Sequence, residues 1–252
     1  MPLRSTDRQS TATLDGYLSG DAIAQVQRVL HKFTRRSLCD FDLTGGLAVG
    51  MHRSLHNASG PPRALNDIDV VVDGFRDVPE ILARDFLVLH VHPSAPSGKI
   101  VVQLADAEEA VRVDVISTRG ATRMRSRLMD TALGTLRIVS VEDLAARAVA
   151  VLMDLARGKS APSKFAELYL WLSPLMDAEK SESAWHDHRG DDDPPTFGEA
   201  HAIVRGLVES RRELLVVPEY SRDLDANCPK CVETGVWRLS PKRQILSVLG
   251  YV

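Results

Sequence analysis

The stretch LNDIDVVVDG, residues 65–74, constrains this chain more than any other, because two aspartates precede a run of three valines. The valine run predicts a strand that is buried on both faces. Side chains at positions i and i+2 of a strand point to the same face, so Asp67 and Asp69 would stand side by side with like charge. Such a pair costs free energy unless a cation lies between the carboxylates. The pattern therefore predicts a divalent metal site at the mouth of a strand.

Two further features predict the rest of such a site. Gly45 and Gly46 lie between a predicted strand and a predicted helix, where backbone amides can approach a phosphate, and Thr44 adds a hydroxyl beside them. Asp114 lies among valines in a later predicted strand, where a buried carboxylate needs a partner. Three carboxylates on adjacent strands could hold one or two Mg²⁺ ions, which would bind a triphosphate, orient the leaving pyrophosphate and lower the pKa of an attacking hydroxyl. Asp69 and Asp114 could also share the task of accepting the proton of that nucleophile.

The distribution of apolar residues predicts an α/β fold: a domain with a mixed β-sheet over residues 1–140, followed by a helical C-terminal part over residues 141–252. Residues 1–18 are polar, and we expect little order there. The first part should contain helices at 19–37, 47–55 and 78–86, and strands at 41–46, 67–73, 87–92, 99–105 and 110–117. The second part should contain helices at 140–158, 163–176, 196–215 and 240–252, with a charged loop at 184–195.

Composition excludes several classes of protein. The 252 residues carry a formal net charge of −3, with 44% hydrophobic and 26% charged residues, which is typical of an ordinary globular protein. The near-neutral balance argues against a generic DNA-coating protein. No apolar run approaches the roughly 20 residues of a membrane span, and the N-terminus lacks the apolar core of a signal peptide. We therefore expect a cytoplasmic protein without a membrane partner.

The chain has three cysteines, a low and odd number that does not suggest a secreted disulfide scaffold. Cys228 and Cys231 form a CxxC pair that a zinc knuckle would need, but a closed zinc site takes about four ligands and there is no second CxxC. His186 and His188 on an extended segment would complete a Cys₂His₂ set, and Cys39 is another option. The alternatives are a metal-free turn or a site shared across a dimer.

Two groups of basic residues have competing interpretations. The run RGATRMRSRLM holds four arginines, which form either a solvated loop or a cationic edge that attracts a triphosphate or an RNA backbone: Arg119, Arg123, Arg125 and Arg127. His52 and His56 are four residues apart on a predicted helix, yet the HExxH pattern is absent, which favours ordinary core or surface histidines over metal ligands.

The order of a glycine pair, a DxD in an apolar strand and a lone Asp in a later strand resembles the DNA polymerase beta nucleotidyltransferase superfamily. LTGGLAVGMH and RALNDIDVVVD look most like the branch of the abortive-infection nucleotidyltransferase toxins, and the similarity continues through IVSVEDLAARAVAVLMDLARG and SKFAEL. It covers roughly residues 40–172. The resemblance implies a nucleotidyltransferase fold that binds Mg-NTP, with phosphate at the glycine pair. Relatives carry a basic residue in a helix after the sheet, then a Lys and an acid near the start of a second helix, and Arg147, Lys164 and Glu167 match these positions. The resemblance implies that Arg147 and Lys164 present positive charge to the triphosphate from the helical part.

The chain departs from the pattern of this superfamily at two places. The gap from Gly46 to Asp67 is longer than in compact members, and Phe165 stands where many relatives have an Asp after the helical Lys. The first change is easily accommodated in a loop. The second changes the helical motif itself.

The leading functional hypothesis is an enzyme that transfers a nucleoside monophosphate from Mg-NTP to an acceptor hydroxyl on tRNA, on a protein or on a small molecule. The resemblance adds the hypothesis of a toxin paired with an antitoxin. A second hypothesis is a non-catalytic nucleotide- or partner-binding protein of the same fold, which loss of a metal-binding carboxylate would favour. A third is a zinc-dependent interaction module in the C-terminal part.

Overall fold

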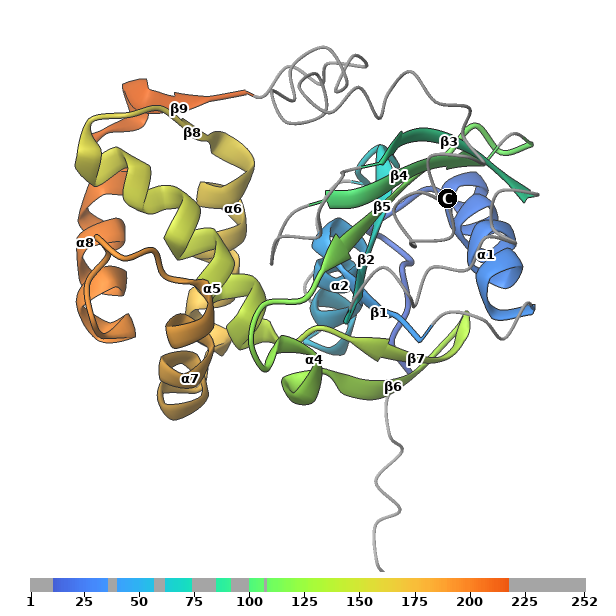
Figure 1. The fold of residues 1–252 in the computed structure, drawn as a ribbon, viewed down its shortest axis with the longest axis horizontal. Helices are drawn as coiled ribbons and strands as arrows, with labels where there is room; N and C mark the ends of the chain where they lie inside the picture. Colours follow the sequence, from blue (N-terminus) through green and yellow to red (C-terminus); the bar gives the residue numbers. More distant parts are fainter. Residues whose placement is uncertain are drawn as a thin grey trace, which may run out of the picture.

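The computed structural model describes residues 11–35, 40–56, 62–73, 85–91, 100–106 and 108–217. Figure 1 shows two parts, a β-sheet with its helices and a separate group of helices that begins with α5. No helix within these ranges has the length and apolar character needed to cross a membrane. Cys39, Cys228, Cys231 and the predicted C-terminal helix lie outside the described residues, as does most of the predicted helix at 78–86.

Seven strands in the described ranges form one mixed sheet with the order β3-β4-β5-β2-β1-β7-β6. The strands are β1 (Asp42–Thr44), β2 (Asp67–Val72), β3 (Phe86–Val91), β4 (Ile100–Asp106), β5 (Arg112–Ser117), β6 (Arg127–Thr131) and β7 (Gly134–Ile138). The central strand β2 is parallel to β5 and antiparallel to β1, while β1 is parallel to β7. The predicted α/β class with a mixed sheet is confirmed, and β6 and β7 are strands that the sequence pattern did not predict.

The helices occupy most of the remaining described chain. The sheet part contains α1 (Gly20–Arg35), α2 (Gly45–Leu55) and the short α4 (Thr122–Arg125). The helical part contains α5 (Val141–Leu152), η2 (Met153–Arg157), α6 (Ser163–Leu172), η3 (Ser173–Leu175), α7 (Ala178–His188), α8 (Phe197–Ser210) and η4 (Arg212–Leu214), with a two-stranded sheet of β8 (Ala161–Pro162) and β9 (Leu215–Val216). Ser140 caps α5 by accepting a hydrogen bond from the Asp143 amide at 3.1 Å.

Two local predictions were wrong. Residues 11–18 are ordered, because Ala12, Leu14 and Tyr17 are buried in the sheet core and the Ala12 backbone bonds to β6. The predicted loop at 184–195 begins as helix, since α7 continues to His188 and buries Trp185 in the helical core. In both cases apolar side chains among polar neighbours find a core that local composition does not reveal.

Buried apolar side chains form two clusters. The first packs the sheet against α1 and α2 and includes Leu144, Ala145 and Leu172. The second lies among α5, α6, α7 and α8 and begins at Ala146. Because α5 contributes to both clusters, it joins the sheet to the helical part.

Candidate metal and nucleotide site

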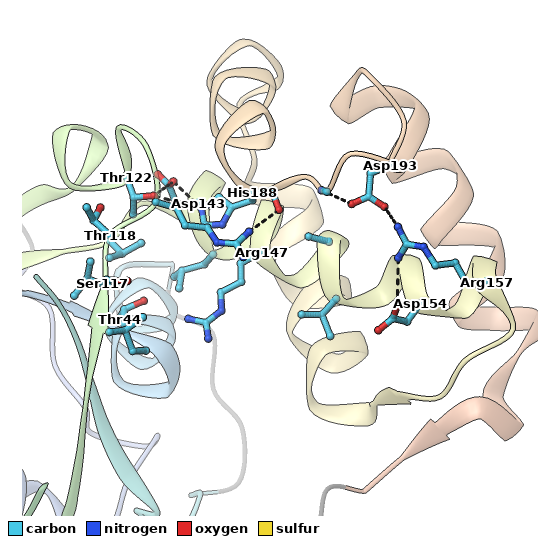
Figure 2. A pocket seen from close by; sticks show the side chains of 18 residues that line it. Thr44, Ser117, Thr118, Thr122, Asp143, Arg147, Asp154, Arg157, His188 and Asp193 are labelled. Atoms are coloured by element: carbon cyan, nitrogen blue, oxygen red, sulfur yellow. Dashed lines mark hydrogen bonds and ion pairs between the residues drawn. The ribbon is translucent and has the colours of Figure 1, made fainter. Parts of the chain in front are cut away.

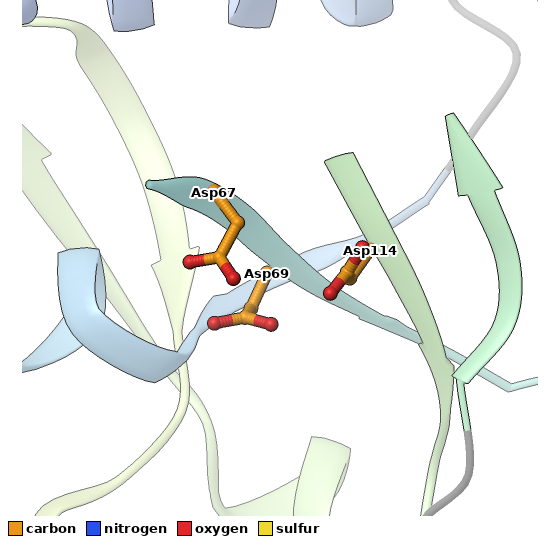
Figure 3. Close-up of side chains that lie close together, drawn as sticks. All are labelled: Asp67, Asp69 and Asp114. Atoms are coloured by element: carbon orange, nitrogen blue, oxygen red, sulfur yellow. The ribbon is translucent and has the colours of Figure 1, made fainter. Parts of the chain in front are cut away.

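The three predicted carboxylates lie together on one face of the sheet. Asp67 and Asp69 are two residues apart on β2, and the parallel register places Asp114 of β5 directly beside Asp69. One oxygen of each carboxylate lies within 4.8 Å of the others. Figure 3 shows the three side chains grouped together on neighbouring strands. Asp114 is buried and the other two are partly buried. A set of carboxylate oxygens at this spacing fits a hard divalent cation such as Mg²⁺.

The cluster (Asp67, Asp69 and Asp114) carries more negative charge than its surroundings neutralise. Burial and the neighbouring Asp67 raise the pKa of Asp69 to about 7, although the positive charges of Arg147 and Lys164 oppose this shift. Burial also raises the pKa of Asp114. A bound cation would favour the ionised form of both side chains.

Arg112 is a site residue that the sequence analysis missed. Its Nη2 donates to Asp67 Oδ2 at 2.5 Å, and its Nε lies 3.1 Å from Asp114 Oδ1. Gln103 of β4 donates to the same Asp114 oxygen at 3.0 Å. The available signal was position, because Arg112 precedes Asp114 by two residues on a predicted strand and therefore shares its face. A guanidinium thus already contacts two of the three carboxylates.

Gly45 has a strict steric role at this site. It has a φ of +59°, and a Cβ there would lie 1.9 Å from Asp69 Oδ2. Helix α2 begins at Gly45, two residues earlier than predicted, so the helix N-terminus lies against the Asp69 carboxylate. Thr44 is paired with Asp69 in the β1–β2 register. Gly46 is less constrained, since a Cβ would meet only the Tyr17 hydroxyl at an ordinary 3.5 Å.

A cavity of about 420 Å³ lies between the sheet and α5. Thr44, Val71 and Ile116 belong to its lining, and the register places them on the same sheet face as the carboxylate cluster. Figure 2 shows Thr44, Ser117 and Thr118 on the sheet side and Arg147 on the α5 side. The sheet face that carries the cluster therefore continues into a cavity large enough for a small ligand.

The two cations implied by the family resemblance both approach the cluster. Arg147 lines the cavity and makes no hydrogen bond or ion pair with any described residue. Lys164 packs over the Phe165 ring at 5.5 Å, and its positive charge opposes the rise in the pKa of Asp69 and of Asp114. Glu167 instead faces outward and pairs with Arg63 at 3.3 Å.

Two arginines of the run, Arg123 and Arg125, are not solvated, whereas Arg127 is exposed at the start of β6. Arg123 is buried and pairs with Asp42 and Asp73. Arg125 donates to Asp143 and Asp187, each at 2.7 Å. These guanidiniums hold the chain after β5 in place and are not available to an RNA backbone.

The histidines have structural partners. His52 is buried, and its Nε2 lies 2.8 Å from the Val139 carbonyl oxygen, as expected of a core histidine. His188 Nε2 lies 3.1 Å from Asp143 Oδ1. Since His186 and His188 end a helix, they do not converge as they would on an extended segment, and the cysteines proposed as their zinc-binding partners lie outside the described residues.

The sequence matches no protein-family model, and no match appears among curated proteins. The resemblance to nucleotidyltransferases therefore remains a prediction from the quoted motifs.

Proposed function

We propose that this protein is a metal-dependent nucleotidyltransferase that transfers a nucleoside monophosphate from Mg-NTP to an acceptor hydroxyl. The observation that supports this most is the cluster of Asp67, Asp69 and Asp114 on the sheet face that continues into the cavity. Like charges at this spacing are unfavourable without a cation, and Mg²⁺ with a triphosphate supplies one. The steric fit of Gly45 over Asp69 supports a carboxylate held in a fixed position.

The residues of the cluster would hold Mg²⁺, which when bound neutralises triphosphate charge, orients the leaving pyrophosphate and lowers the pKa of the attacking hydroxyl. Arg147 and Lys164 bring positive charge to the same place, where it favours a bound triphosphate. The acceptor oxygen forms a bond to the α-phosphorus while the bond to pyrophosphate breaks. Asp69 or Asp114 takes the proton of the acceptor hydroxyl.

The biological part of the proposal rests on the motif resemblance. It favours the toxin of a toxin–antitoxin pair, which acts in the cytoplasm where NTPs are available. The acceptor belongs to tRNA, a protein or a small molecule. The pairing of Arg123 and Arg125 with acidic residues takes two of the four arginines out of the argument that the run made for RNA.

One observation favours the alternative of a non-catalytic nucleotide- or partner-binding protein. Arg112 contacts Asp67 and Asp114, so a guanidinium supplies part of the positive charge that a metal ion would bring. In that case the cluster would be a structural ion-pair network, as many acidic clusters are. If nucleotide binding depends on metal, the cluster is a ligand site and not merely a structural ion-pair network.

The test is isothermal titration of each Mg-NTP into wild type and the Asp67→Asn/Asp69→Asn variant. The matched control is Asp191→Asn/Asp192→Asn, which removes two exposed carboxylates from a turn in the helical part. We expect magnesium-dependent binding in wild type and the control, and none in the cluster variant. Transfer of the α-labelled nucleotide to tRNA or to protein in a lysate then identifies the acceptor. Binding without transfer favours the nucleotide-binding alternative. No NTP binding at millimolar concentration overturns the proposed transferase and leaves a partner-binding protein as the leading hypothesis.

A further inference from the structure

Two arginines line the cavity without a carboxylate partner among the described residues. Arg119 donates from Nη1 to the His188 carbonyl oxygen at 2.9 Å, which is a neutral acceptor. Arg147 has no hydrogen bond or ion pair with the described chain. A third arginine in the same cavity, Arg157, pairs with Asp154 and Asp193, so the cavity does not leave all of its arginines without carboxylate partners. The unpaired arginines give one end of the cavity an excess of positive charge.

The two unpaired guanidiniums line the same cavity. Burial lowers the pKa of Arg119, and the positive charge of Arg147 lowers it further. Arg147 also acts on Asp69, so it lies within electrostatic reach of both the carboxylate cluster and Arg119. An anion between the two guanidiniums would remove the repulsion.

The turn that carries Arg119 is fixed in position. The Ala121 amide donates to Asp187 Oδ2 at 2.8 Å. Gly120 has a φ of +45°, and a Cβ there would lie 2.0 Å from Asp187 Oδ1. The turn thus packs directly on the Asp187 carboxylate at the end of α7. This packing preorganises the backbone at Arg119 before a ligand binds, which reduces the conformational entropy lost on binding.

Hydroxyl groups lie on the same wall of the cavity. Thr118 precedes Arg119, and its buried Oγ1 has no hydrogen-bond partner among the described residues. Buried polar atoms in native proteins nearly always have a partner. Thr44 and Ser117 add two more hydroxyls to the lining. Hydroxyls and guanidiniums together offer more donors than a carboxylate can accept, and they suit the several oxygens of a phosphoryl group.

We propose that Arg119, Arg147 and Thr118 form a phosphate-binding subsite in the cavity, distinct from the metal-binding carboxylates. Guanidinium groups bind phosphate through two parallel hydrogen bonds, and a half-buried pair of them favours a doubly charged anion. The phosphate comes either from the NTP or from a phosphorylated acceptor. Only this choice of source rests on the proposed function, because phosphate binding at the subsite needs no divalent metal.

The test is titration of inorganic phosphate and pyrophosphate, with a chelator present, into wild type, Arg119→Gln and Arg119→Lys. The matched control is Arg212→Gln, which removes an exposed arginine of η4 outside the cavity. We expect Arg119→Gln to weaken anion binding about tenfold or more, Arg119→Lys to weaken it less, and the control to leave it unchanged. Equal affinity in all four proteins, or no anion binding by wild type, overturns the subsite. Circular dichroism verifies that each variant is folded. If Arg119→Gln does not fold, Arg119→Lys serves as the test variant.

A second titration identifies the source of the phosphate and uses a non-hydrolysable Mg-NTP. If Arg119→Gln weakens its binding by the factor seen with free phosphate, the subsite takes a phosphate of the NTP. If binding of the Mg-NTP is unchanged, and free phosphate still binds the NTP-saturated protein, the subsite takes a phosphate of the acceptor. The Asp67→Asn/Asp69→Asn variant keeps metal-free phosphate binding in either case. Its loss of Mg-NTP binding therefore reports on the carboxylate cluster alone.

Discussion

Gly45 and Gly120 pack in the same way against carboxylates whose charges are balanced very differently. Both glycines have positive φ, and in each case a Cβ would collide with an aspartate oxygen, of Asp69 or of Asp187. Burial would raise the pKa of Asp187, but hydrogen bonds from Arg125 and from a backbone amide outweigh it and lower that pKa. At Asp69 burial acts together with a neighbouring carboxylate, and the pKa rises to about 7.

The difference separates a structural carboxylate from a candidate functional one. Asp187 of α7 and Asp143 of α5 share the guanidinium of Arg125, so a positive charge in direct contact balances these two carboxylates. In the carboxylate cluster the charge is only partly matched, by Arg112. Groups with a strongly perturbed pKa beside a cavity are more often functional than those within a satisfied network.

The largest expected effect is on stability at the structural carboxylate. Asp143→Asn removes one of the two negative charges that Arg125 pairs with. It also replaces one of the two carboxylate oxygens that accept from Thr122 and Ser140 with an amide donor. We expect a loss of about 3 kcal/mol in the free energy of unfolding, because the partly buried guanidinium of Arg125 loses one of its two carboxylate partners. Asp69→Asn in a chelating buffer should instead leave stability unchanged or raise it, since it relieves repulsion. Urea unfolding of both variants measures this, and equal destabilisation would contradict the comparison.

A second prediction concerns the glycine under the candidate functional carboxylate. Gly45→Ala is expected to cost about 2–4 kcal/mol, because left-handed backbone strain adds to a collision with Asp69. Gly158→Ala is the control: its φ of +69° is similar, but no atom lies within 4 Å of the added Cβ, so it should cost only about 1–2 kcal/mol. The two variants are compared by thermal and urea unfolding. Identical losses would mean that the Asp69 carboxylate moves aside freely.

The third prediction uses pH in the absence of divalent metal. The folded pKa of Asp69, about 7, is above its usual value, so the folded state binds a proton more tightly than the unfolded state does. The contribution of Asp69 to stability therefore falls as pH rises from about 4 to about 7. The lowered pKa of Asp143 acts in the opposite sense, and its contribution is lost on acidification below pH of about 4.

Unfolding of wild type and Asp69→Asn across this pH range isolates the first of these contributions. The stability of the variant relative to wild type should increase between pH of about 4 and about 7. Parallel curves would show that Asp69 keeps an ordinary pKa in the folded protein.

The smallest expected effect concerns the cation that already contacts the carboxylate cluster. Arg112→Gln should tighten Mn²⁺ binding several-fold, since the guanidinium no longer competes for Asp67 and Asp114. Arg28→Gln is the control, because it breaks an exposed ion pair with Glu109 elsewhere in the sheet part. Electron paramagnetic resonance of free Mn²⁺ measures both. Weaker binding in Arg112→Gln would instead assign the arginine to positioning the carboxylates.

Local sequence patterns predicted the parts of the site that depend on strand periodicity. Asp67 and Asp69 share a face because side chains alternate along β2, and the valine runs identified both β2 and β5. That Asp114 lies beside Asp69 depends on a parallel pairing between strands more than 40 residues apart, which the motif order implied and periodicity did not.

The parts that escaped prediction depend on contacts distant in sequence. Arg119 is held by a turn that packs on Asp187. The Asp187 carboxylate accepts a hydrogen bond from the Ala121 amide of this turn, although the two residues are 66 positions apart in the sequence. Arg125 reads as a solvated basic residue until α7 and α5 bring acidic partners to it. Strand β6 is short and largely exposed, and in β7 only Leu136 and Ile138 alternate with a polar residue, which is too short a run to identify a strand.

Helix α5 passes from one hydrophobic core to the other within a single turn, between Ala145 and Ala146, and Arg147 follows directly. A change in the tilt of α5 would therefore pivot at the boundary between the two cores, which lies beside the cavity. A protein that tilts the outer end of α5, through α7 or α8, would change the separation of Arg147 and Asp69 without contacting either residue. We expect control of this site from a distance to operate on that angle, and a bound partner on the helical part to alter nucleotide affinity more than protein stability.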